Sequence, residues 1–279
     1  MKIRKRNVFA GMIAALLVCF LAAAVYCFMR KSTFKYSNLA DNESKTKVQT
    51  MLEANGIPRE NISALFDLCE EFYRVPYNNI VKSGWKDALI QFFSYNENDA
   101  VDHLEKQPDN SLTCRMAAFI VLKDNISWSE TDIVPAVMKD PQSRQKLTDD
   151  EDLTHYDLLF SNIENFAVTS SQDLVNTVTA YWKDAGIVFE NENVRLITAY
   201  GSSGGDAAVQ NIHTAISIYD AGSVWLLEKY DPIFPFQLSC FNSEDQLIDY
   251  MKKRVSSEKN YAIFSNDHCI YQNQTFLLF

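Results

Sequence analysis

The stretch AAVQNIHTAISIYDAGSVWLLEKY, residues 207–230, decides the fold because it reads as two β-strands joined by a tight turn. β-Branched and aromatic residues are frequent in 207–219 and again in 224–230, which is typical of strands. The segment 220–223, DAGS, has the composition of a hairpin turn. The sequence therefore predicts an antiparallel hairpin at the centre of a sheet.

Further strands and helices are predicted on both sides of this hairpin. The additional strands are expected at residues 194–200, 235–241 and 261–265. Helical periodicity and capping residues predict helices at about 42–55, 61–75, 100–106, 112–122, 149–163, 172–185 and 243–254. Helices thus dominate about 32–185 and strands about 186–279, so we expect an α+β fold with a helical lobe packed on an antiparallel sheet.

An apolar run at residues 8–29 contains no charged residue. It is long enough to cross about 30 Å of hydrocarbon, and the cations before it favour a cytoplasmic N-terminus. We expect residues 1–31 to form a basic cytoplasmic stub and a transmembrane signal anchor. Residues 32–279 would then be the extracytoplasmic domain of a single-pass cell-membrane protein. A cleaved signal peptide and a lipoprotein modified at Cys27 are the alternatives.

The charge of the chain excludes one class of partner. The net charge is −10, and all 36 acidic residues lie after residue 31. This excludes a nucleic-acid binder, which needs clustered cations to neutralise phosphates. A hydrophobic content of 47% also excludes a disordered chain.

The cysteines and histidines do not form a known metal motif. There is no Cys-x-x-Cys pair and no His-Glu-x-x-His pair, so a zinc ribbon, a thioredoxin-like site and a zincin are disfavoured. We expect no metal and no cofactor. Outside the cell, any pair among Cys69, Cys240 and Cys269 could form a disulfide, and the sequence leaves the pairing open.

Cys114 is placed where a thiolate would be favoured. If Ser111 caps the helix at 112–122, Cys114 lies in the first helical turn, where the helix dipole and free N–H groups stabilise negative charge. Gln107 and Asn110 lie just before it and are candidates to assist an oxyanion. The glycine-rich segment 201–206 is a candidate lid.

The hairpin supplies a base and an acid for this thiol. His213 shares a strand face with the small residues Ala215 and Ser217, which leave room for a cleft. A two- or four-residue turn centred on Ala221-Gly222 places Ala215 opposite Glu228, so Glu228 becomes a diagonal same-face neighbour of His213, about 7–8 Å away at Cβ. The sequence thus predicts a catalytic set in which Cys114 is the nucleophile, His213 the general base and acid, and Glu228 the residue that orients the imidazole.

Each of the three residues also has an ordinary structural interpretation. Free cysteines are often buried in cores, a histidine in a sheet can be held by its hydrogen bonds, and a strand glutamate can face solvent.

The order of nucleophile on a helix, His on a strand and acid on the next strand resembles papain-like cysteine hydrolases, which include peptidases and bacterial cell-wall amidases. A second resemblance covers nearly the whole chain after the apolar run. Residues 36–41 (YSNLAD), 114–119 (CRMAAF), the His213 strand, and 227–229 (LEK) ending near 235–237 (PFQ) are similar to the bacterial surface family called domain of unknown function 4300. Relatives often carry Asn before the Cys, where this chain has Thr113. The resemblance implies a surface location and a matched Cys, His and Glu, but no reaction.

These observations predict a membrane-anchored surface protein that is a papain-like cysteine hydrolase, either a peptidase or a cell-wall amidase, with peptide or cell-wall material as its substrate. The alternative is a non-catalytic extracytoplasmic binding module built on the same frame. A redox protein with a reversible disulfide at Cys114 is the third possibility. The substrate and the oligomeric state stay open.

Overall fold

The structure is a computed structural model that describes residues 32–107, 112–135, 141–164, 168–202 and 208–273, together with Val18 and Phe20. The rest of the apolar run at 8–29 lies outside the described residues, and so do Asn110, Ser111 and residues 203–207. Within the described part, no helix combines the length and the apolar character that crossing a membrane requires.

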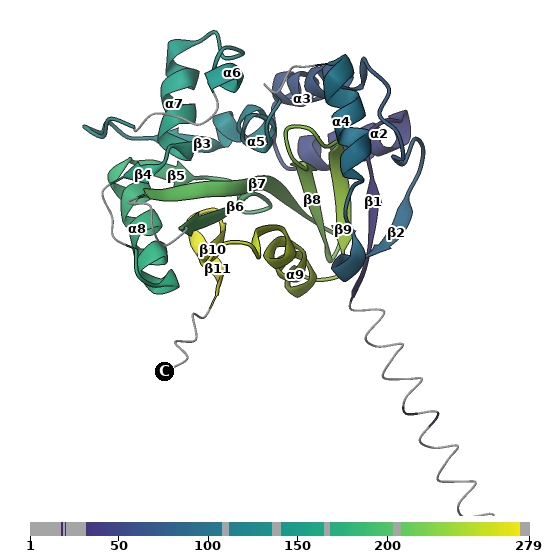
Figure 1. Cartoon of the computed structure of the whole chain (residues 1–279). Helices are drawn as coiled ribbons and strands as arrows, with labels where there is room; N and C mark the ends of the chain where they lie inside the picture. Colours follow the sequence, from purple (N-terminus) through teal and green to yellow (C-terminus); the bar gives the residue numbers. More distant parts are fainter. Residues whose placement is uncertain are drawn as a thin grey trace, which may run out of the picture.

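An antiparallel sheet forms the centre of the molecule (Figure 1). Its strands follow the order β11-β10-β6-β7-β8-β9-β1-β2, and β4 adds to β7. The strands are β1 (Thr33–Ser37), β2 (Lys86–Leu89), β4 (Ile163–Glu164), β6 (Val194–Ser202), β7 (Ala208–Asp220), β8 (Ser223–Lys229), β9 (Phe236–Phe241), β10 (Asn260–Ser265) and β11 (His268–Gln272). A separate pair consists of β3 (Ile126–Trp128) and β5 (Ile187–Phe189).

The helices cover both faces of this sheet (Figure 1). They are α2 (Asn42–Ala54), α3 (Arg59–Tyr73), η1 (Ile90–Phe92), α4 (Glu97–Lys106), α5 (Cys114–Leu122), η2 (Lys123–Asn125), α6 (Pro141–Arg144), α7 (Asp150–Phe160), α8 (Ser171–Asp184) and α9 (Glu244–Val255). One face packs against α9, and the other packs against α3, α5 and α7. The expected α+β class, with helices packed on an antiparallel sheet, is confirmed.

Local capping chemistry explains where several helices begin. The Asp41 side chain accepts a hydrogen bond from the backbone N–H of Ser44 at the start of α2. Ser170 and Asp173 form a capping box at the start of α8. The helix expected at 61–75 begins earlier, at Arg59, so Asn61 does not cap it but lies inside it and donates to Asp124 at 2.9 Å.

Strands also occur in the part that was expected to be helical. β1 pairs with β9 and β2, so it lies inside the main sheet although it is near the start of the described chain. The helix expected to reach residue 163 ends at Phe160, and Ile163 pairs with Val209 of β7 instead. The division into a helical first part and a β-rich second part is therefore too simple.

The hairpin of β7 and β8 has the register expected from the sequence. Asp220 lies opposite Ser223 and Ile216 lies opposite Leu227. Ala221 and Gly222 form the two-residue turn, with φ values of 49° and 81°. Positive φ at both positions is the geometry whose twist matches that of the two strands.

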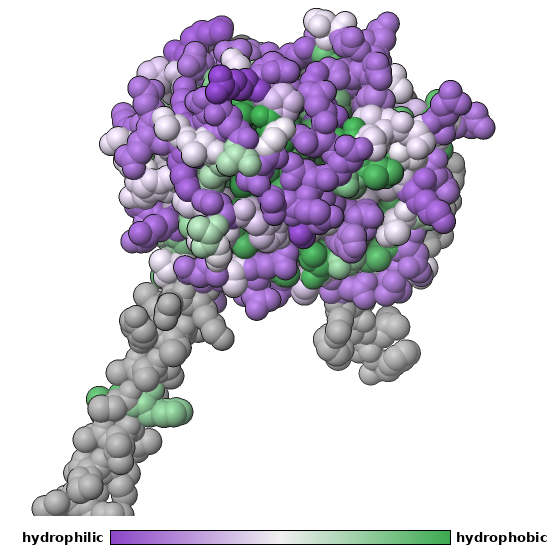
Figure 2. Space-filling view, turned by 180° about the vertical axis from the view of Figure 1, so that it is seen from behind, coloured by the Kyte–Doolittle hydropathy of each residue, from purple (hydrophilic) through white to green (hydrophobic). Residues whose placement is uncertain are grey.

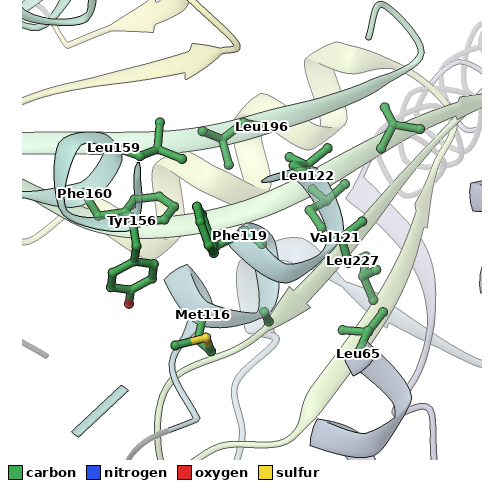
Figure 3. Close-up of a cluster of buried hydrophobic side chains, with 14 of the residues drawn as sticks. Leu65, Met116, Phe119, Val121, Leu122, Tyr156, Leu159, Phe160, Leu196 and Leu227 are labelled. Atoms are coloured by element: carbon green, nitrogen blue, oxygen red, sulfur yellow. The ribbon is translucent and has the colours of Figure 1, made fainter. Parts of the chain in front are cut away.

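Helix α5 lies in the middle of the larger core, as its almost wholly apolar sequence predicts (Figure 3). Phe119 packs edge-to-face with Tyr156 of α7, with ring centroids 5.4 Å apart. Figure 3 shows Val121 and Leu122 on the side of the helix toward Leu227. Because the helix is fixed on several sides, the residue at its N-terminus is held in a defined position.

Candidate active site

The strands β7 and β8 separate at the point where the candidate site lies. Their pairing runs from the turn to Ile216 and Leu227; beyond it β7 continues with β6, and β8 continues with β9. The register of β7 shifts near His213, which faces Ala199 while Asn211 faces Tyr200. Such a bulge bends a strand and redirects its side chains. Helix α5 packs against both separating strands, so its N-terminus meets His213 there.

Cys114 is the first residue of α5. Thr113 caps the helix, because its hydroxyl accepts from the backbone N–H of Met116 at 3.2 Å. The cap is therefore Thr113, while the expected cap Ser111 lies outside the described residues. The first N–H groups of a helix have no partner within the helix, so the position of Cys114 favours a thiolate.

The three predicted residues meet in space. His213 Nε2 lies 2.7 Å from Glu228 Oε2, and the ring is also hydrogen-bonded to the Cys114 thiol. Since Nε2 faces the carboxylate, Nδ1 is the ring nitrogen left for the sulfur. All three residues are buried, with exposed fractions of 6% for Cys114, 5% for His213 and 2% for Glu228.

The surroundings of the pair favour an ionised thiol beside a protonated imidazole. Burial alone would raise the pKa of Cys114, but the hydrogen bond to His213 and the charge of Arg115 lower the pKa below its ordinary value. Burial opposes protonation of His213, but the hydrogen bonds to Cys114 and Glu228 raise its pKa above the ordinary value. The backbone N–H of Thr214 also bonds the sulfur and stabilises the thiolate.

A buried polar network holds the Glu228 carboxylate. The Tyr250 hydroxyl donates to Glu228 Oε1 at 2.5 Å, and Gln237 Nε2 donates to that hydroxyl at 3.0 Å. The Tyr95 hydroxyl in turn donates to Gln237 Oε1 at 2.6 Å. Burial would raise the pKa of Glu228, but its bonds to His213 and Tyr250 and the charge of Arg254 lower the pKa, so the carboxylate is kept ionised and oriented.

Lys229, the neighbour of Glu228 in β8, is a buried cation that no sequence pattern indicated. It is fully buried, and its Nζ donates to the carbonyls of Asp231 at 2.9 Å and Pro232 at 3.1 Å. It also lies 3.8 Å from the centroid of the Phe72 ring. Burial lowers the pKa of Lys229 to about 7, although the charges of Asp231 and of the Cys69 and Cys114 thiols act in the opposite direction. In the sequence it is a Lys at the end of a mostly apolar strand, directly after Glu228.

The two oxyanion candidates have different outcomes. Gln107 forms the C-cap of α4, and its Nε2 donates to the carbonyl of Glu71 at 3.0 Å. This contact ties the amide to α3. Asn110 lies outside the described residues. The backbone N–H of Thr214 is a donor that the structure places against the sulfur, and the N–H groups of Cys114 and Arg115 lie in the first turn of α5.

The other cysteines differ from Cys114. Among the described residues, Cys69, Cys240 and Cys269 are free thiols. Burial raises the pKa of Cys69 to about 12, and it also raises the pKa of Cys269. No group of three or more potential metal ligands occurs within the described ranges. Of the four thiols in this part of the chain, Cys114 alone has a lowered pKa.

Removing the helix cap at the site should have a moderate effect on stability. Thr113→Ala should lower the free energy of unfolding by about 1 kcal/mol, because the N–H of Met116 loses its acceptor. Urea unfolding monitored by circular dichroism measures this change. Thr113→Ser keeps the hydroxyl and should restore most of the loss; equal losses in both variants would contradict the capping role.

Comparison with known proteins places the chain in a family without adding a reaction. No curated protein and no solved structure matches it. Residues 35–274 match the family described as Domain of unknown function (DUF4300), and this range includes Cys114, His213 and Glu228. Because the match covers most of the sequence, the chain belongs to the DUF4300 family.

Proposed function

We propose that this protein is a membrane-anchored, extracytoplasmic cysteine hydrolase of papain-like arrangement that cleaves amide bonds in peptides or cell-wall material. The observation that carries the proposal is the contact of His213 with both Cys114 and Glu228 at the N-terminus of a buried helix. Support for the location comes from the uncharged apolar run at 8–29 and the cations before it.

The geometry supports a two-step reaction. The Cys114 thiolate attacks the amide carbonyl carbon, and the N–H groups at the start of α5 stabilise the resulting oxyanion. Protonated His213 gives its proton to the leaving amine as the C–N bond breaks, which leaves a thioester on Cys114. Neutral His213 then takes a proton from water, the hydroxide attacks the thioester, and the acid product departs as the thiolate and the imidazolium are restored. Glu228 keeps the ring oriented throughout.

The pH dependence of alkylation tests this proposal. Iodoacetamide should modify Cys114 with an apparent pKa well below about 8.5, the value of an ordinary thiol. Exposed Cys269 is the internal control, because its pKa is raised and it should stay unmodified at pH 6. Peptide mapping by mass spectrometry separates the two sites.

A substrate screen then separates the enzyme from the binding module. Hydrolysis of peptide and cell-wall amide substrates should be lost in Cys114→Ala and retained in Cys269→Ala. An ordinary titration of Cys114, or binding of cell-wall material without cleavage, would favour the non-catalytic module. A reversible disulfide at Cys114 under oxidising conditions would instead support the redox alternative.

A further inference from the structure

The described domain, residues 32–273, begins beside a cavity at one end of the molecule. Ser32 lines a cavity of about 370 Å³ between η1 and α9, together with Ile90, Gln91, Asp249, Lys252 and Lys253. Thr33 lines a second cavity, of about 500 Å³, that includes Phe92 and the strand β2. Figure 1 shows the start of β1 and α9 at the same end of the molecule. The short helix η1 contributes to both cavities.

This end presents an exposed aromatic side chain on a fixed support. Phe92 is 78% exposed, whereas Ile90 and Phe93 beside it are buried. The ammonium of Lys253 donates to the carbonyl of Phe93 at 2.5 Å, which ties α9 to the end of η1. Figure 2 shows a surface that is mostly hydrophilic, with smaller hydrophobic patches between purple residues. Phe92 is therefore a defined apolar projection from a polar surface.

The charge around this end differs from that of the whole domain. Lys86, Lys252 and Lys253 line the two cavities, against two carboxylates, those of Asp87 and Asp249. In sequence, Arg30 and Lys31 come directly before Ser32. Lysines thus outnumber carboxylates by one in these linings, and Lys252 forms an ion pair with Asp249 at 3.1 Å; this local balance in an otherwise acidic domain fits an anionic surface.

We propose that this end, the exit face (Ser32, Lys86, Phe92, Lys252 and Lys253), lies on the outer surface of the bilayer and takes anionic phospholipid headgroups into the groove between η1 and α9. The inference rests on the membrane anchoring contained in the proposed function. The apolar run ends at Met29, and the few residues from there to Ser32 span at most about 10 Å. A spanning run therefore holds the exit face at the headgroup layer, with Phe92 directed to the acyl boundary and the lysines at the phosphates.

Tryptophan quenching tests the proposal with the full chain in lipid nanodiscs. The acyl chains carry bromine, which quenches tryptophan emission at short range. Phe92→Trp places a reporter on the exit face. Val188→Trp places one on β5, at a residue that is 53% exposed, and Figure 1 shows β5 on the side of the molecule opposite β1 and β2. After subtraction of the parent protein's emission, the added signal of the Phe92→Trp variant should be strongly reduced, and that of the Val188→Trp variant should be unchanged.

The outcomes separate the two parts of the argument. If the full chain does not enter the nanodiscs, membrane anchoring itself fails. If it enters and both reporters keep their emission, the exit face is overturned while the anchor stands. A Lys86→Glu, Lys252→Glu double variant, made in the Phe92→Trp background, tests the headgroup chemistry. In discs that contain phosphatidylglycerol, this variant should lose the quenching. In discs of phosphatidylcholine alone, it should keep the quenching. Equal quenching of the variant in the two kinds of disc would overturn the anionic headgroup assignment.

Discussion

Replacing Glu228 by Gln should slow the alkylation of Cys114 at neutral pH by about tenfold, because each unit by which the pKa of a thiol rises above the ambient pH lowers its thiolate fraction about tenfold. The substitution keeps the shape of the side chain but removes the negative charge 2.7 Å from His213 Nε2. Without that charge the imidazolium is less favoured, so the pKa of His213 falls and the pKa of the Cys114 thiol rises. The fraction of thiolate at neutral pH decreases in proportion. Stopped-flow alkylation across pH measures the change.

Two controls separate this electrostatic effect from a general loss of structure. Glu192→Gln changes a largely exposed carboxylate and should react like the parent protein. Tyr250→Phe removes one hydrogen bond to the Glu228 carboxylate but keeps its charge, so it should show a smaller loss than Glu228→Gln. A Glu228→Gln protein that folds normally and reacts at the parent rate would show that Glu228 has no influence on the thiol.

Replacing Lys229 by Met should remove a large part of the pH dependence of stability between pH 7.5 and pH 9.5. The folded pKa of Lys229 is about 7, against an ordinary value of 10.5. Between these values the unfolded state binds a proton that the folded state does not, so the free energy of unfolding rises with pH by about 1.4 kcal/mol per unit. The parent protein should therefore gain about 2–3 kcal/mol relative to Lys229→Met over this window.

Urea unfolding at the two pH values gives this difference directly. Other titrating groups occur in both proteins, so their contributions cancel in the comparison. Lys35→Met, which changes an exposed lysine on β1, should follow the parent profile. Parallel profiles for the parent protein and Lys229→Met would mean that Lys229 keeps its proton in the folded state.

The sequence predicts the hairpin and the main contacts of the site because both depend on local rules. A two-residue turn fixes the register of β7 and β8, and this register brings Glu228 to His213. The apolar character of residues 116–122 likewise predicts that α5 is buried. The packing of α5 against β7 joins segments about 100 residues apart, so it does not follow from local rules. The structure shows this contact.

The features that were missed depend on contacts between distant segments. The strand β1 is short, and its partner β9 lies about 200 residues later, so nothing nearby in the sequence indicates the pairing. Lysine is almost never fully buried without partners, and the carbonyls that satisfy Lys229 become available only when residues 231–234 fold back over it. The network behind Glu228 joins side chains from three separate parts of the chain.

The position of β1 between β9 and β2 also has a consequence for the kinetics of folding. β1 is synthesised about 200 residues before its partner β9, so the sheet is completed only after a very long loop has closed. Such high contact order predicts slow folding, and it makes a chain truncated before Phe236 unable to complete its sheet. Until β9 pairs with β1, the β1–β2 pair has an unpaired edge. A chain in this state is the form most prone to aggregation.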